Sequence, residues 1–137
     1  MRADIADKLN QFFEELAAPL RVDLATIAQA VAAEFHLAPE EAPLLLHSRG
    51  AHRLTVPKSV VVVLALQWLP VTRAVLARLL GVEDSAIYRM QAGARLRASG
   101  DAEFSAKLQR LREQLPSKLT GPRRNPRKTK PRKETIP

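Results

Sequence analysis

Apolar residues near the start of this chain recur at the spacing of an amphipathic helix. Their common face is formed by Ile5, Leu9, Phe12, Phe13 and Leu16. Because proline interrupts a helix, we expect this helix to end before Pro19. Asp23 is a suitable N-cap for a second helix. The apolar positions of that helix are Leu24, Ile27, Val31 and Phe35.

The middle of the chain predicts a short helix, a basic loop and a long apolar helix. Pro39 is suited to the first position of a helix that ends near His47, and residues 48–56 are expected to form a loop. Pro57 then precedes KSVVVVLALQWL, in which four consecutive valines favour a strand by propensity alone. Since no partner strand is visible anywhere in the sequence, we expect this segment to be a buried central helix.

The next segment predicts two helices joined by a tight turn. Thr72 caps RAVLARLL, which ends at Gly81, and either Asp84 or Ser85 caps AIYRMQAGARLRA. This is the pattern of a helix-turn-helix, whose second helix enters the major groove of DNA. Residues 100–101 break and recap the chain before a last helix, DAEFSAKLQRLREQL.

The expected fold is all-α: a compact multi-helix domain containing the helix-turn-helix, with a disordered basic C-terminal tail. We divide the chain into an N-terminal amphipathic helix (1–18), a helical DNA-binding domain (19–115) and a Lys/Arg/Pro-rich tail (116–137). The tail holds five of the ten prolines and few apolar residues, so it can form neither a helix nor a core.

Charge is spread unevenly over the 137 residues, whose formal net charge is +8. Residues 1–47 carry a net charge of −5, residues 48–115 a net charge of +6, and residues 116–137 a net charge of +7. Blocks of positive charge are typical of phosphate-binding surfaces. Double-stranded DNA is therefore the expected partner, and the acidic first helix is available to a protein partner.

Several other classes of protein are not expected. The chain has no cysteine and no GxxxxGK[S/T] loop, and its three histidines lack the spacing of metal ligands. The sequence therefore predicts no enzyme, cofactor, metal or nucleotide. The start is polar and acidic, and no apolar run reaches the length of a membrane span. We expect a cytoplasmic protein associated with the nucleoid.

The order of these elements resembles the C-terminal DNA-binding domain of the bacterial replication initiator DnaA. The similarity covers about residues 23–115: IAQAVAAEFHL, a basic loop with the step Val56-Pro57-Lys58, then LALQWLP, VLARLLG and DAEFSAKLQRLREQL. Small stand-alone proteins with this domain exist, and this chain looks like one. The resemblance implies a helix-turn-helix in the major groove and an arginine of the basic loop in the minor groove. Lys58 stands where the family has the arginine that follows the loop's proline.

The chain departs from the family in the recognition turn. The family's signature is Gly-Gly-Arg-Asp-His-Thr/Ser-Thr-Val, and the matching residues 81–88 here are GVEDSAIY. Gly81 and Asp84 match, whereas Glu83, Ser85 and residues 86–87 replace the arginine, the histidine and the two hydroxyl residues. The set that reads the DnaA box is therefore largely replaced.

The candidate DNA-binding residues come from the basic loop, the helix-turn-helix and the tail. In the body of the chain they are Arg49, Arg53, Lys58, Arg73, Arg78, Ser85, Tyr88, Arg89, Gln91 and Arg95, with Arg97 as a further phosphate contact. In the tail they are Arg123, Arg124, Arg127, Lys128, Lys130, Arg132 and Lys133. The sequence thus predicts a non-catalytic, sequence-specific or shape-selective DNA-binding regulator of transcription or replication. The alternative is a protein interaction module that binds DNA nonspecifically through its tail.

Overall fold

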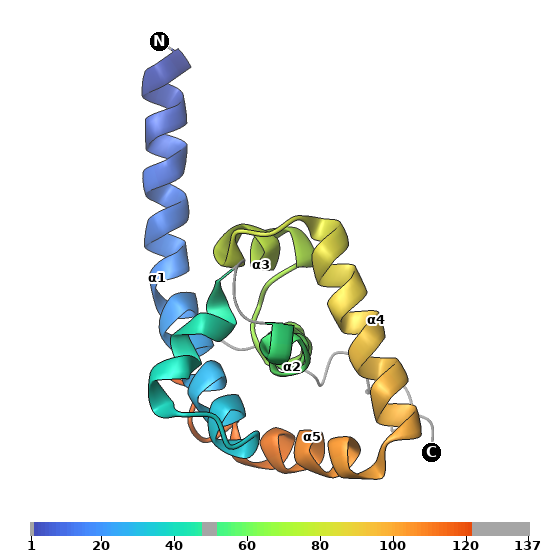
Figure 1. The fold of residues 1–137 in the computed structure, drawn as a ribbon. Coiled ribbons are helices and arrows are strands. Elements are labelled where there is room, and N and C mark those ends of the chain that lie inside the picture. The colour runs from blue at the N-terminus through green and yellow to red at the C-terminus, as the bar shows by residue number, and fades with distance from the viewer. Residues whose placement is uncertain (1, 48–51, 122–137) are drawn as a thin grey trace, which may run out of the picture.

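The structure is a computed structural model, and it describes residues 2–47 and 52–121 (Figure 1). All regular elements within these residues are helices, which confirms the predicted all-α class. Their order is α1 (Arg2–Glu34), the 3-10 helices η1 (Pro39–Leu46) and η2 (His52–Leu54), then α2 (Thr55–Trp68), α3 (Arg73–Leu80), α4 (Asp84–Gly100) and α5 (Ala102–Gln114).

Helix α2 is the centre of the body, as predicted for the valine-rich segment. Figure 1 shows it nearly end-on, with α1, α3, α4 and α5 arranged around it. The run Val60–Val62 and Leu64 are at most 1% exposed. A helix that is apolar on all sides is stable when other helices cover it, and here burial outweighs the strand propensity of valine. The helix begins at Thr55, two residues earlier than predicted, because Pro57 is tolerated in a first turn.

The predicted break between the first two helices is wrong, because α1 continues through Pro19. A proline in a helix interior costs about 3 kcal/mol. Packing offsets this cost, since Ala17, Leu24 and Ile27 are at most 2% exposed against the body. The two predicted amphipathic segments are therefore one helix, and its N-terminal half projects beyond the other helices (Figure 1).

Asp23 does not cap a helix; it lies within α1, fully buried, and holds the C-terminal segment of the body. Its Oδ1 accepts hydrogen bonds from the backbone N–H of Thr120 (2.9 Å) and from its hydroxyl (3.3 Å). Its Oδ2 accepts from the N–H of Gly121 at 2.8 Å. A Cβ at residue 121 would lie only 2.9 Å from Oδ2, so a side chain there would crowd this contact.

Asp23 also shows that residues 116–121, which we assigned to the disordered tail, belong to the packed body. Leu119 is only 7% exposed, and residues 120–121 are bonded to Asp23. Residues 122–137, including all the predicted tail contacts, lie outside the described residues.

We expect Asp23→Ala to lower the free energy of unfolding by about 2 kcal/mol, because the backbone N–H groups of Thr120 and Gly121 lose their buried, charged acceptor. Urea denaturation followed by circular dichroism measures this loss. The matched control is Asp7→Ala on the same helix, whose side chain is exposed and which should change stability little. Equal stability of the two variants would contradict the role of Asp23.

The C-terminal end of α1 is joined to α5. Glu34 accepts two hydrogen bonds from the Arg110 guanidinium, at 2.9 and 2.6 Å, and this contact raises the pKa of Arg110. The rings of Phe35 and Phe104 meet edge-on, with centroids 6.3 Å apart. His36 follows in a left-handed conformation (φ 58°), just after the end of α1. These contacts close the ring of helices around α2.

Helices α3 and α4 are joined by the three residues 81–83, and the predicted caps of this segment are mostly confirmed. The Thr72 hydroxyl accepts from the N–H of Val75 at 3.2 Å, and Gly81 adopts a left-handed conformation (φ 72°) at the end of α3. The N-cap of α4 is Glu83, so neither Asp84 nor Ser85 holds that position. Asp84 is instead the first helical residue, where the positive N-terminal end of the helix dipole stabilises its carboxylate.

We expect Gly81→Ala to lower the free energy of unfolding by about 1 kcal/mol, because a side chain disfavours this positive φ. No neighbouring atom lies within 4 Å of an added Cβ, so the backbone conformation is the whole cause. Gly93→Ala is the matched control, because its Cβ also meets open space but the backbone is helical. The control should stabilise the protein by about 0.5 to 1 kcal/mol, and destabilisation in both variants would contradict this explanation.

The sequence predicts no apolar segment as long as a membrane span, but one helix has such a segment. Residues Asp7–Glu34 of α1 are long and apolar enough, by length and composition, to cross a membrane. Ile27 and Val31 in this stretch are fully buried against the other helices. The C-terminal half of α1 thus packs as the core helix of a folded body, a class of helix that passes the same test.

Candidate nucleic-acid interface

Helix α4 presents a solvent-facing ridge, formed by Ser85, Tyr88, Ala92 and Leu96, opposite its buried side. Tyr88 is 58% exposed and Leu96 is 75% exposed, whereas Ile87 is fully buried beneath them. After its first residue, Asp84, the helix carries three arginines and no carboxylate. This composition makes the outer surface of α4 basic from Arg89 to Arg97.

One flank of α4 borders a groove against the start of α2, which we call the α2–α4 groove. Arg89, Gly93 and Arg97 follow one another at four-residue intervals and therefore share this flank. The groove has a volume of about 300 Å³. Its lining comprises Thr55, Val56, Ser59, Ala86, Arg89, Met90, Gly93 and Arg97. It therefore combines two guanidinium groups with two hydroxyl groups, and no carboxylate lies among these described residues.

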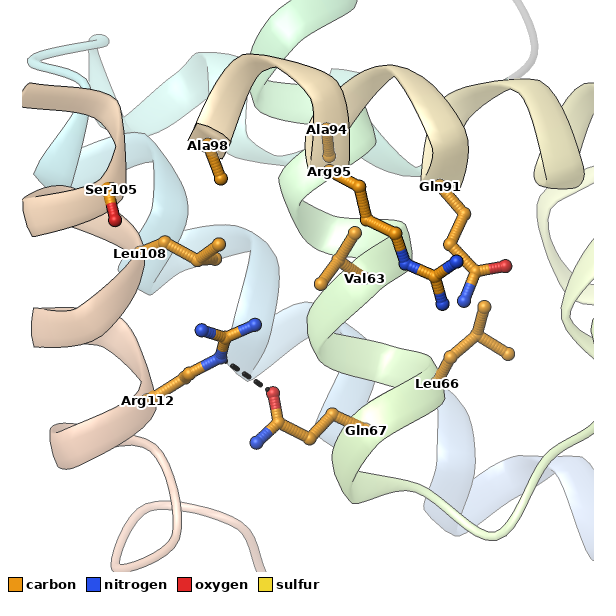
Figure 2. Close-up of a pocket in the computed structure, with 10 residues that line it drawn as sticks. All are labelled: Val63, Leu66, Gln67, Gln91, Ala94, Arg95, Ala98, Ser105, Leu108 and Arg112. Atoms are coloured by element: carbon orange, nitrogen blue, oxygen red, sulfur yellow. Dashed lines mark hydrogen bonds between the residues drawn. The ribbon is translucent and has the colours of Figure 1, made fainter. Parts of the chain in front are cut away.

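The other flank of α4 borders a second cavity, the α4–α5 pocket, of about 310 Å³. Figure 2 shows Arg95 from α4 and Arg112 from α5 extending into it above an apolar floor that includes Val63 and Leu108. The Arg112 Nε donates to the Oε1 of Gln67 at 2.9 Å. Gln91 and Ser105 complete its polar lining, which again includes no carboxylate among the described residues. Cationic side chains thus lie on both flanks of the α4 ridge.

The structure separates the predicted residues between these two flanks. Arg89 lines the α2–α4 groove, whereas Gln91 and Arg95 line the α4–α5 pocket. Ser85 and Tyr88 lie on the ridge between them. The residues that sequence reasoning grouped on one helix therefore face three directions.

Arg73 and Arg78 of α3 are placed by aromatic rings. The Arg73 guanidinium lies over the Tyr88 ring, 5.6 Å from its centroid, and so adds a cation beside the α4 ridge. The Arg78 guanidinium lies 3.9 Å from the centroid of Phe13 in α1. Cation–π contacts of this kind fix the direction of a long side chain. Arg73 is thus held next to α4, and Arg78 is held next to α1.

The basic loop is only partly described, and Arg49 lies outside the described residues. Arg53 forms an ion pair with Glu41 of η1. Glu41 also accepts a hydrogen bond from the N–H of Ala38 at 3.0 Å. The Arg53 guanidinium, with this backbone hydrogen bond, lowers the pKa of the Glu41 carboxyl. Arg53 therefore joins the loop to η1, a contact the sequence did not predict.

Lys58 lies in the first turn of α2 and is partly buried. Burial disfavours its charged form and lowers its pKa. It is one residue from Ser59, which lines the α2–α4 groove, but Lys58 itself does not line that groove.

No family model, curated protein or solved structure matches this chain. The resemblance to the DnaA C-terminal domain therefore stays a prediction from the sequence. Among the described residues, no group of three or more histidine, aspartate or glutamate side chains is placed to hold a metal ion.

Sequence reasoning missed two contributors to these surfaces, Arg112 and Thr55. Arg97, which we expected as a further phosphate contact, lies beside Arg89, as the four-residue spacing of Arg89, Gly93 and Arg97 implies. Arg112 and Thr55 carried no such signal. Their positions beside α4 depend on how α5 and α2 pack against it.

Proposed function

We propose that this chain is a non-catalytic double-stranded DNA-binding protein that regulates transcription or replication. In this proposal α3, residues 81–83 and α4 act as a helix-turn-helix, and α4 enters the major groove. The observation that carries the proposal is the position of cations on both flanks of α4. Arg89 and Arg97 lie on one flank, and Arg95 with Arg112 lies on the other.

This arrangement suits a helix that lies between two phosphate backbones. The major groove is about 12 Å wide and admits one α-helix, so each flank of the helix faces one strand. Guanidinium groups on each flank would then contact phosphates and fix the orientation of the helix. The absence of carboxylates from α4 after Asp84 avoids repulsion by these phosphates.

The α4 ridge is the part that would reach the base edges. The exposed Leu96 offers an apolar contact to thymine methyl groups, and Ser85 and Tyr88 offer hydroxyl groups. None of the four ridge residues, Ser85, Tyr88, Ala92 and Leu96, is an arginine. We therefore infer that phosphate contacts supply most of the affinity, and that sequence preference is modest.

The test is fluorescence anisotropy with the full chain and with a variant lacking residues 122–137. This deletion retains the contacts of Asp23 with residues 120–121, which a cut after residue 115 would remove. One duplex carries a DnaA box and the other carries the same bases in scrambled order, over a salt series. We expect the shortened protein to bind both duplexes in a salt-dependent way. A preference for the duplex with the DnaA box at high salt would additionally support recognition of this sequence, as the resemblance to the DnaA family implies.

The alternative function is a protein interaction module that binds DNA only through its tail. The exposed apolar residues in the projecting half of α1 favour it. If deletion of residues 122–137 abolishes all DNA binding while the protein stays folded, the α4 proposal is wrong and this alternative is supported.

A further inference from the structure

The projecting half of α1 carries a continuous row of exposed apolar side chains, the α1 seam. Ile5 is 59% exposed, Leu9 63%, Phe12 60% and Leu16 56%. Single exposed apolar residues are common, but a contiguous group marks an interaction surface. The seam is uncovered by any other described part of the chain.

The spacing of the seam is that of a coiled coil. Its residues follow at intervals of four, three and four, a repeat of 3.5 residues that keeps one narrow row facing a partner helix. Phe13, on a neighbouring side of α1, already contacts Arg78 of α3, and Ala17, directly after the seam, is only 1% exposed. The N-terminal half of α1 projects beyond the other helices (Figure 1), and the seam runs along this half up to the first contacts with the body.

We propose that the α1 seam binds the same seam of a second copy of this chain, with the two helices antiparallel. In this register Ile5 meets Leu16 of the second copy, and Leu9 meets Phe12 of the second copy. Both contacts occur twice by symmetry, so all four seam positions are covered. In this register residue 4 of each copy lies beside residue 17 of the other copy, and α1 begins at residue 2, beside residue 19 of the other copy.

Charge complementarity selects the antiparallel orientation. Lys8 and Glu15 each directly precede a leucine of the seam, and both are exposed. In an antiparallel pair these flanking positions face each other, so Lys8 of each copy meets Glu15 of the other. In a parallel pair these two residues would not meet, and the two bodies would crowd the same end of the coil.

Thiol cross-linking tests the orientation directly, because the natural chain contains no cysteine. We expect an equimolar mixture of the full-length Ile5→Cys and Leu16→Cys variants to form a mixed disulfide under mild oxidation. Ile5→Cys alone should not cross-link, because the two copies of residue 5 would lie about 16 Å apart along the axis. Efficient cross-linking of Ile5→Cys alone would show a parallel pair and overturn the proposal.

Sedimentation equilibrium of the full chain tests the dimer itself. We expect a concentration-dependent dimer that Leu9→Glu abolishes, and that Lys8→Glu weakens roughly tenfold through like charges across the interface. Adding Glu15→Lys to Lys8→Glu should restore the dimer. The matched control is Val22→Glu, which replaces an apolar residue that is 56% exposed on the same helix but outside the seam.

A chain that stays monomeric at high micromolar concentration overturns the proposal. Cosedimentation of that monomer with phosphatidylserine vesicles would then assign the seam to a lipid surface, and its absence would assign the seam to a different protein. None of these measurements uses DNA, so their failure is distinct from failure of the proposed function.

Discussion

The full-length chain carrying both Arg89→Glu and Arg97→Glu is expected to bind a short duplex roughly 100-fold more weakly than the unaltered chain at low salt. Both guanidinium groups line the α2–α4 groove, and each is proposed to contact a phosphate. Losing two phosphate contacts should also reduce the slope of log K against log salt by about two units. Fluorescence anisotropy across a salt series measures both effects.

The matched control reverses two charges elsewhere on the body. Lys107 lies 4.9 Å from the Phe35 ring centroid, and Lys118 donates to Gln114 at 3.0 Å, so both belong to the α1–α5 side of the molecule. The Lys107→Glu and Lys118→Glu variant changes the net charge equally. Its affinity should fall much less, since only long-range attraction is lost. Equal losses in the two variants would show that net charge, rather than α4, governs binding.

Replacing Ile87 by alanine is expected to lower the free energy of unfolding by about 3 kcal/mol. Ile87 is fully buried on the inner side of α4, so its truncation removes apolar contacts and leaves a cavity. Because α4 packs against α2 and α3, this loss weakens the attachment of the proposed recognition helix to the body. Urea denaturation gives the free energy of unfolding.

Leu96→Ala is the matched control for this substitution. Leu96 lies on the same helix but is 75% exposed, so its truncation should change stability by no more than about 0.5 kcal/mol. Comparable destabilisation by both substitutions would contradict the orientation of α4. Leu96→Ala at the same time tests the ridge, because a contact with thymine methyl groups would make it weaken DNA binding without unfolding the protein.

The parts of the fold that were predicted correctly depend on neighbours in the sequence. Thr72 accepts a hydrogen bond from an N–H three residues later, and Asp101 does the same for Phe104 at 3.0 Å. Gly81 ends α3 because a residue without a side chain adopts the left-handed conformation readily. Local signals of this kind can be read from a few adjacent residues.

Two of the wrong predictions concern residues whose surroundings come from far along the chain. Pro19 was expected to end a helix, and Asp23 to begin one. The packing of α1 against the body maintains the helix through Pro19, and residues 120–121 bind Asp23 from nearly 100 positions away. Neither outcome leaves a signal in the sequence around Pro19 or Asp23.

By itself, the sequence determined the all-α class, the central position of the valine-rich helix and the basic character of α4, because periodicity and composition act within single elements. Only the tertiary structure decided that Arg53 pairs with Glu41, and that Arg95 and Arg112 line one pocket. It also decided which apolar residues of α1 remain exposed. These features depend on how whole helices pack, because burial and pairing are properties of two surfaces brought together rather than of either sequence segment alone.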